Sequence, residues 1–314
     1  MLGRPGSAVS DLLRDADAAM YEAKRTGRGR VQVFDAVAAR RSVERLSLRQ
    51  EVQGALQRAE LRVVYQPIVA LATGRVEGFE ALLRWRHPVH GDVPPDVFVP
   101  LAEETGAIGP IGNWVVQEAC RRLAGWHRLP GGAGLTVSVN LSAVQLDDAE
   151  CVDRVLTALA VEGVPPAMLR LEVTENMEKT DAQLAQLHRL REAGVSLVVD
   201  DFGVSYSNLA HLKDLPVDSL KIDRSFVSAL GEDGVAGRRR GIGLGIVRAV
   251  LALSEAAGLD VVAEGVETPA QRATLLALGC RSAQGWLFSP GVPAEQATEL
   301  LLAGGVLAAA TETV

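Results

Sequence analysis

Residues 169–200 read LRLEVTENMEKTDAQLAQLHRLREAGVSLVVD and contain the repeating unit that decides the fold. Two runs rich in Leu and Val, Leu169–Thr174 and Val195–Asp200, flank an amphipathic stretch at Asp181–Glu192. Apolar runs without strict alternation are expected of strands that are covered on both faces. The segment therefore predicts a strand–helix–strand unit of a parallel sheet.

The same alternation continues on both sides of this unit, from about Leu61 onward. Further strands are expected at Arg62–Leu71, Glu77–Trp85, Leu135–Leu141, Ser219–Ile222, Leu259–Ala263 and Ala283–Phe288. Further helices are expected at Trp114–His127, Asp148–Val161, Ile246–Ala257 and Pro269–Leu278. Eight strands that alternate with helices predict an α/β fold of the modified (β/α)8 TIM-like barrel type.

The barrel is expected to be irregular at its start. Only a few residues around Thr73–Gly74 separate the first two strands, whereas a parallel crossover needs about a dozen or more. The first strand is therefore predicted to be antiparallel to the second. Before it, Ala38–Arg58 carries a partial helical stripe and is interpreted as a connecting helix, with a dimerising helix as the alternative.

The stretch Gly231–Gly245 reads GEDGVAGRRRGIGLG, and its glycine density predicts a flexible loop. Its GIGLG part does not follow a strand in the dinucleotide-binding pattern, so a nucleotide fingerprint is not indicated. Because loops after strands lie on the active face of such barrels, a role in access or regulation is the alternative to a simple solvated loop.

The bulk composition limits the class of function. The chain has 314 residues and a formal net charge of −7, so it is a poor candidate for binding long nucleic acid through its overall field. The N-terminus has no apolar h-region and no uncharged apolar run approaches about 18 residues, so neither a signal peptide nor a membrane segment is expected. Cys120, Cys151 and Cys280 lie far apart, which favours reduced thiols in a cytoplasmic protein over disulfides or a zinc site.

Polar and charged residues fall at the ends of nearly all the expected strands. They are Glu80, Asn140, Glu172, Glu175, Asp200, Asp201, Lys221, Asp223, Glu264, Glu267 and Gln284. An isolated buried carboxylate costs several kcal/mol unless it is paired or metal-bound. One such residue would usually be an ion-pair partner, but several at one rim would repel each other, and only Arg84 and Lys221 offer positive charge nearby. The pattern predicts bound divalent metal.

The residue types narrow the metal and the chemistry. Carboxylate and amide oxygens without Cys or His suit Mg²⁺ or Mn²⁺. A lone pair such as Asp200–Asp201 is usually a solvated turn, but at a strand end both side chains can face one site and bridge two ions. Two ions about 3.5–4 Å apart are the usual equipment for in-line attack on a phosphodiester.

A series of motifs in order resembles the EAL family of cyclic-di-GMP phosphodiesterases. The motifs are YQPIV, EALLRW, FVPLAEETG, SVNLS, LEVTE, DDFG, LPVDSLKIDRSFV, VVAEGVET and QGWLFS, and the resemblance covers roughly residues 48 to 305. It implies hydrolysis of cyclic di-GMP to the linear dinucleotide pGpG. It also implies two Mg²⁺ or Mn²⁺ ions per site and a homodimer.

The resemblance assigns a role to each site residue. It implies ligands of a first metal ion at Glu80, Asn140, Glu172 and Asp200, and ligands of a second at Asp200, Asp201 and Glu264. It implies substrate contacts or support at Gln66, Arg84, Asp223, Glu267 and Gln284. Lys221 matches the lysine proposed to activate the attacking water, in a catalytic set with Glu80, Asp201 and Glu175, and Glu175 resembles the glutamate that braces the loop after the fifth strand.

The chain departs from the family pattern in one loop. After Asp201 the family usually reads FGTGYS, whereas this chain has Val204 and Ser205 in place of the threonine and second glycine. The departure leaves an alternative function open, namely an impaired module that binds cyclic di-GMP as a sensor or interaction domain. A two-metal enzyme for another phosphodiester is a third possibility.

The resemblance divides the chain into four parts. Leu12–Phe34 looks like the last helix and strand of a GGDEF-type diguanylate cyclase domain, so residues 1–34 are interpreted as a remnant of such a domain. Residues 35–47 are a helical linker, residues 48–306 are the EAL barrel, and residues 307–314 are a tail.

Overall fold

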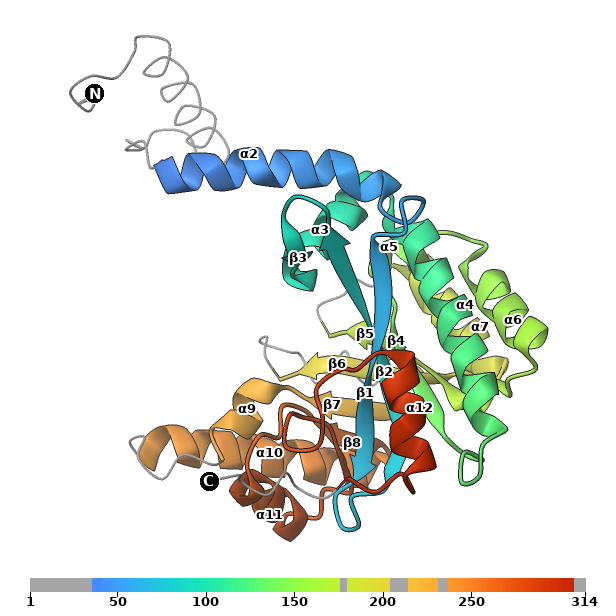
Figure 1. Cartoon of the computed structure of the whole chain (residues 1–314). Helices are drawn as coiled ribbons and strands as arrows, with labels where there is room; N and C mark the ends of the chain where they lie inside the picture. Colours follow the sequence, from blue (N-terminus) through green and yellow to red (C-terminus); the bar gives the residue numbers. More distant parts are fainter. Residues whose placement is uncertain (1–35, 176–179, 204–213, 231–236, 308–314) are drawn as a thin grey trace, which may run out of the picture.

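One closed barrel organises the chain in the computed structural model, which describes residues 36–175, 180–203, 214–230 and 237–307 (Figure 1). The strands are β1 (Leu61–Ala70), β2 (Val76–His87), β3 (Gly91–Val93), β4 (Thr136–Asn140), β5 (Leu169–Thr174), β6 (Ser196–Phe202), β7 (Ser219–Ile222), β8 (Asp260–Ala263) and β9 (Ser282–Ala283). Their order is β1-β9-β8-β7-β6-β5-β4-β2-β3, and pairing of β1 with β2 closes the ring, with β3 attached to β2. The predicted barrel is confirmed.

Strand β1 is antiparallel to both of its neighbours, β2 and β9, whereas β2 and β4 to β9 pair in parallel. The predicted antiparallel first strand is therefore confirmed. The hairpin turns at Gly74, whose φ of 71° lies in the left-handed region, and a Cβ there would lie 2.4 Å from the carbonyl oxygen of Leu307. Glycine serves both demands, because it tolerates positive φ and leaves space for the approaching backbone.

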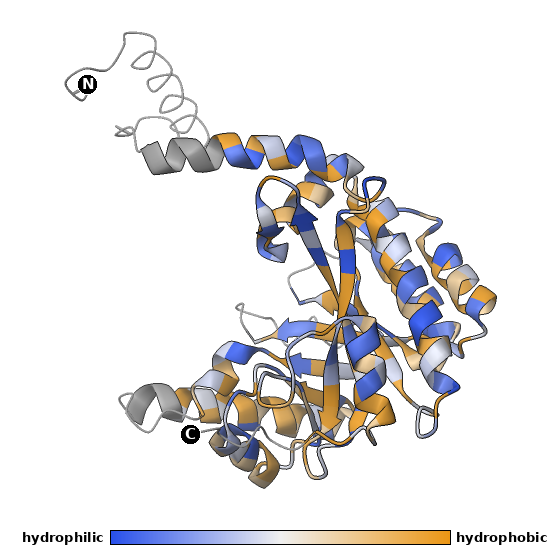
Figure 2. Ribbon diagram, viewed as in Figure 1, coloured by the Kyte–Doolittle hydropathy of each residue, from blue (hydrophilic) through white to orange (hydrophobic). Residues whose placement is uncertain are grey.

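Helices cover the outside of the barrel (Figure 1). They are α2 (Ala36–Glu51), α3 (Pro95–Thr105), α4 (Ile108–His127), α5 (Ala143–Leu146), α6 (Cys151–Glu162), α7 (Asp181–Glu192), α9 (Arg224–Ser228), α10 (Gly237–Ala257), α11 (Pro269–Ala277) and α12 (Ala294–Leu302), with 3-10 turns η1 (Val52–Gly54) and η2 (Pro166–Met168). Figure 2 shows the apolar residues gathered on the barrel strands and on the helix faces turned toward them. Capping boxes begin α7 at Thr180 and α11 at Thr268, which satisfies backbone N–H groups that a helix start leaves free.

Two expected elements differ in extent. The last strand was expected over Ala283–Phe288, but β9 ends at Ala283 and the chain turns. The cause is a close approach: a Cβ on Gly285 would lie 2.1 Å from the carbonyl oxygen of Val266, and Leu287 N donates to that same oxygen. The connecting helix expected over Ala38–Arg58 ends earlier, because α2 gives way to η1 after Glu51.

The flexible loop expected at Gly231–Gly245 is wrong for its second half. Helix α10 begins at Gly237, while residues 231–236 lie outside the described residues. One glycine of this part, Gly243, serves close packing. A Cβ on the buried Gly243 would lie 2.7 Å from the Cβ of Ala229, the residue that follows α9, so glycine lets α10 approach the end of α9 closely.

The described residues cover only part of the proposed division of the chain into four parts. Residues 1–34, the departing Val204 and Ser205, and residues 308–314 lie outside the described residues. Along α2 the burial changes near the expected start of the barrel domain, since Leu46 is exposed and Leu48 is buried. Across the described ranges, no helix is both long enough and apolar enough to cross a bilayer.

Candidate active site

Carboxylates from four strands or strand ends converge on one buried lysine inside the barrel. Lys221, on β7, is only 1% exposed. Its Nζ lies 2.6 Å from Glu264 Oε1, 2.8 Å from Glu172 Oε2, 3.0 Å from Glu80 Oε2 and 3.6 Å from Asp200 Oδ1. The three shortest contacts occupy the three protons of the ammonium group. The strands meet here because the carboxyl ends of parallel strands share one edge.

Two neutral amides extend this cluster. Gln284 Nε2 donates to Glu80 Oε2 at 2.6 Å and to Glu264 Oε1 at 2.9 Å, and Asn140 Nδ2 donates to Glu80 Oε1 at 3.0 Å. Glu80 is thus held by Lys221 and both amides. The turn after β9 that Gly285 permits is what places Gln284 against these carboxylates, because β9 ends just before it.

Asp201 joins the cluster through an unusual backbone. Its φ is 54°, in the left-handed region, and its N–H donates to Asp200 Oδ1 at 2.9 Å. Neighbouring strand residues normally point to opposite faces, but this conformation breaks that alternation. Carboxylate oxygens of Asp200, Asp201 and Glu264 all lie within 4.8 Å of one another. The carboxylates of the adjacent pair therefore lie close to each other and to Glu264.

Two opposing effects, burial and the charges of neighbouring groups, set the pKa values of the side chains in the cluster. Burial works to lower the pKa of Lys221, but the surrounding carboxylates, chiefly Glu172 and Glu264, outweigh it and raise that pKa well above its usual value. For Glu80, burial works to raise the pKa, and Lys221 together with the bonded amides lowers it below its usual range. Lys221 is therefore an ammonium ion and Glu80 a carboxylate.

The other acidic groups lack enough positive charge. Burial, followed by repulsion from Glu80, raises the pKa of Glu172 well above its usual value, and burial raises the pKa of Glu264 to about 8. Burial and the neighbouring Asp200 also raise the pKa of Asp201. One ammonium group cannot neutralise this many carboxylates, so the cluster would take up further cations.

The donor set fits divalent metal ions. Glu172 Oε1 and Gln284 Oε1 are buried and have no hydrogen-bond partner among the described residues, so ligand oxygens are free within the cluster. A buried polar atom without a partner is costly, and a cation would satisfy it. Oxygen donors without sulfur or imidazole suit Mg²⁺ or Mn²⁺.

Comparison with known proteins identifies the family. A family model described as the EAL domain matches residues 49–291. This chain belongs to the EAL domain family. Its characteristic glutamate in the EALLRW motif is Glu80, at the centre of the carboxylate cluster.

Two curated relatives come from Pseudomonas aeruginosa. The EAL chain is 45% identical over 294 residues to the bifunctional diguanylate cyclase/cyclic di-GMP phosphodiesterase MucR, covering 93% of the chain and 42% of MucR. It is 43% identical over 300 residues to the cyclic di-GMP phosphodiesterase NbdA, covering 95% of the chain and 37% of NbdA. The chain therefore spans less than half the length of either relative.

A solved structure supports the same relationship. A MucR phosphodiesterase structure in complex with c-di-GMP aligns with a TM-score of 0.73 at 45% identity, covering 80% of this chain and 99% of that one. The EAL fold of this chain and its relationship to cyclic-di-GMP proteins thus rest on both sequence and structure.

The other predicted site residues, which are Gln66, Arg84, Asp223, Glu175 and Glu267, lie on or next to the strands that carry the carboxylate cluster or pair with them. Gln66 is paired in register with Glu80 across β1 and β2, and its side chain donates to Ser289 O at 3.3 Å. Arg84 Nη1 donates to Leu83 O, and burial lowers the pKa of Arg84.

Three acidic residues flank the cluster at its edges. Asp223 caps α9 by accepting from Ser225 N at 2.9 Å. Glu175 Oε2 accepts from Gly203 N at 3.0 Å and so joins the ends of β5 and β6. Glu267 lies at the start of α11, where its backbone N–H donates to Gln271 Oε1. The structure thus brings the predicted metal ligands and Lys221 together, and leaves the predicted substrate residues other than Gln284 at the periphery.

One aromatic residue near the site escaped the sequence analysis. Trp286 follows Gln284 by two residues and is 71% exposed, an unusual state for so large an apolar side chain. The tryptophan in the QGWLFS motif was visible in the sequence, but its exposure was not. The motif had been interpreted as part of a strand, which would have buried it.

Proposed function

We propose that this EAL chain hydrolyses cyclic di-GMP to linear pGpG. Water adds to the phosphorus of one phosphodiester, the bond from phosphorus to the 3′ oxygen breaks, and that oxygen leaves with a proton. The observation that carries the proposal is the oxygen-only cluster of buried carboxylates around Lys221. The names of MucR and NbdA support the same substrate.

The cluster divides into two sets of metal ligands that share Asp200. Glu80, Asn140, Glu172 and Asp200 would hold one ion, and Asp200, Asp201 and Glu264 would hold the other. When bound, two Mg²⁺ or Mn²⁺ ions would acidify the attacking water and offset the charge of the phosphodiester. The free Glu172 Oε1 and the raised pKa values of Glu172 and Glu264 support this division, because both indicate missing positive charge.

Lys221 lies in the same site, and the surrounding carboxylates fix the position of its ammonium group. All three of its protons bind carboxylates, so it fixes the relative positions of β2, β5 and the end of β8. To hold the attacking water or take up its proton, Lys221 must release one of these partners. Glu264, whose carboxylate is the more accessible partner at 15% exposure, is the one that we expect it to release.

The peripheral residues recognise the nucleotide. Arg84 offers a guanidinium group for a phosphate oxygen, since within the described part of the chain its side chain bonds to a neighbouring backbone carbonyl and to no carboxylate. Glu267 and Asp223 offer carboxylate oxygens that can accept from the N–H groups of guanine. Gln66 on β1 and Gln284 directly after the neighbouring β9 add amide groups. Homodimer formation and a cytoplasmic location stay predictions from the family resemblance.

Turnover tests the proposal against the sensor alternative. Purified chain is incubated with cyclic di-GMP in Mg²⁺, in Mn²⁺ and in chelator, and nucleotides are separated over time. The proposal expects pGpG in both metals and none in chelator. Glu80→Gln should abolish product, whereas Glu150→Gln, an exposed residue of a surface ion pair, should not change it. Tight binding of cyclic di-GMP without any product would show a sensor and overturn the proposal.

A further inference from the structure

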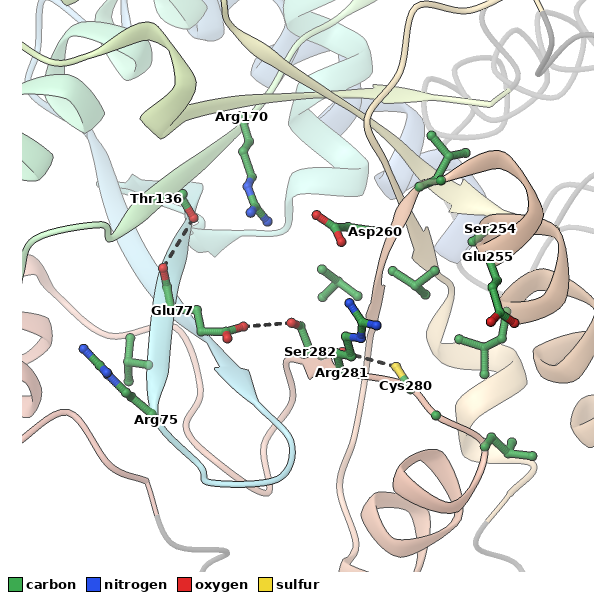
Figure 3. Close-up of a pocket in the computed structure, with 18 of the residues that line it drawn as sticks. Arg75, Glu77, Thr136, Arg170, Ser254, Glu255, Asp260, Cys280, Arg281 and Ser282 are labelled. Carbon is green, nitrogen blue, oxygen red and sulfur yellow. Dashed lines mark hydrogen bonds between the residues drawn. The ribbon is translucent and has the colours of Figure 1, made fainter.

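A large cavity opens at the end of the barrel opposite the carboxylate cluster (Figure 3). Its volume is about 1060 Å³. Among its lining residues are the first residues of four strands, Val76, Thr136, Asp260 and Ser282, and the second residue of β5, Arg170. The cluster around Lys221 lies toward the other ends of the same strands, so the cavity is distinct from the candidate active site.

Four arginines surround this cavity without partners. They are Arg75, Arg170, Arg248 and Arg281. Within the described part of the chain, none of the four makes an ion pair or a side-chain hydrogen bond. Elsewhere on the surface, arginines pair with carboxylates: Arg154 lies 2.6 Å from Asp148. Unpaired guanidinium groups around one hollow repel each other and concentrate positive potential there.

Arg170 is the arginine whose position is best suited to binding a ligand in the cavity. It is partly buried, and it lies on β5 two residues before Glu172, on the face that points into the barrel. Figure 3 shows its guanidinium group extending into the cavity across from Asp260. Because the guanidinium fork matches phosphate oxygens in a bidentate manner, this placement suits a phosphate group better than a simple cation or an apolar ligand.

The other residues that line the cavity indicate a ligand with more functional groups than inorganic phosphate. Carboxylates of Glu77, Glu255 and Asp260 offer acceptors for hydroxyl or amino groups, although one oxygen of Glu77 already accepts from the Ser282 hydroxyl at 2.7 Å. Leu251 and Leu278 add apolar surface. The volume is at the upper end of the range of about 300–1,000 Å³ that is usual for small-molecule sites.

From these observations we propose that the cavity binds a phosphorylated small molecule of nucleotide size, with its phosphates on Arg170 and Arg281 and its hydroxyl or amino groups on the carboxylates. The site is independent of the cyclic-di-GMP proposal, because it shares no residue with the carboxylate cluster.

Isothermal titration in chelator tests the site, because chelator removes metal-dependent phosphate binding at the carboxylate cluster. The probes are GTP, ATP and inorganic pyrophosphate. At least one nucleotide should bind saturably, and more tightly than pyrophosphate. Arg170→Gln and Arg281→Gln should each weaken binding about tenfold or more, because each removes a charge-assisted bond. Thermal unfolding checks that both variants stay folded, and Arg281 is exposed, so its loss should not disturb the fold.

Two control variants make the result specific. Arg128→Gln removes an exposed charge near the same end of the barrel, just after α4, without lining the cavity, and it should change binding less than twofold. Glu80→Gln should leave binding intact. No saturable binding of any probe, equal loss in Arg128→Gln and Arg170→Gln, or loss in Glu80→Gln would each overturn the proposal.

Discussion

Replacing Lys221 with methionine separates the contribution of this residue to the free energy of unfolding from its contribution to hydrolysis. The ammonium group lies 2.6–3.0 Å from oxygens of Glu264, Glu172 and Glu80, and these side chains are at most 15% exposed. Removing one partner of a buried ion pair costs about 3–5 kcal/mol, because it leaves an uncompensated charge. In chelator we expect the free energy of unfolding to fall by this amount. A shift of about 2–4 °C per kcal/mol converts it to a loss of about 6–20 °C in Tm.

Divalent cations supply the charge that Lys221→Met lacks. Mg²⁺ should therefore raise the Tm of the variant more than that of the parent chain, because its carboxylates repel each other more strongly. Hydrolysis should nevertheless stay about 10²–10⁴-fold below the parent at saturating Mg²⁺, since the group that holds or takes up the proton is gone.

Circular dichroism melts with and without Mg²⁺, followed by product analysis on the same samples, measure both effects. Arg189→Met, which removes an exposed ion pair with Asp153, is the control and should change Tm little. Unchanged stability of Lys221→Met in chelator, or an equal Mg²⁺ effect in both chains, would refute the idea that Lys221 offsets the carboxylate charge.

Three further predictions concern the surroundings of the site. Gly285→Ala should lower the free energy of unfolding by about 1–3 kcal/mol and reduce turnover, because its Cβ would meet the Val266 carbonyl and displace Gln284; normal melting and activity would contradict this. Trp286→Ala should raise KM about tenfold or more with a smaller effect on kcat, because stacking of a base on an aromatic ring contributes about 1–3 kcal/mol; steady-state kinetics would show an unchanged KM if the indole is not used. Burial raises the pKa of Cys120 to about 12 and the pKa values of Cys151 and Cys280 to about 11. All three thiols should therefore resist alkylation by iodoacetamide until the chain is unfolded. Alkylation of any of them in the native chain, detected by mass spectrometry, would contradict this.

The repeating units of the barrel were predictable because burial on both faces leaves a clear sequence pattern. The bounds of β5, α7 and β7 agree with the expected ranges Leu169–Thr174, Asp181–Glu192 and Ser219–Ile222. Short or glycine-rich elements were not predictable in this way. Helix α3 was missed although it has Pro95 at its start. The first part of α10, up to Gly245, was taken for a loop, whereas Ile246–Ala257 was predicted as a helix; Gly243 packs closely against the end of α9 rather than terminating the helix.

The composition of the candidate site was predictable, but its internal bonding was not. Polar residues at strand ends indicated a metal cluster, and the parallel register places Asn140 beside Glu172 and Thr174 beside Asp200. No pattern in the sequence shows that one lysine bonds three carboxylates, or that Asp201 adopts positive φ. The arginines of the second cavity were likewise invisible, because they stand at strand starts and on α10, far apart in the chain.

Hydrolysis in ¹⁸O-labelled water tests the central claim most directly. The chain is incubated with cyclic di-GMP and Mg²⁺ in H₂¹⁸O, and the product is weighed by mass spectrometry. The account predicts pGpG with one ¹⁸O atom in its terminal phosphate, formed by the parent chain and absent with Glu80→Gln. No pGpG, or labelled pGpG at equal rates from both chains, would contradict it.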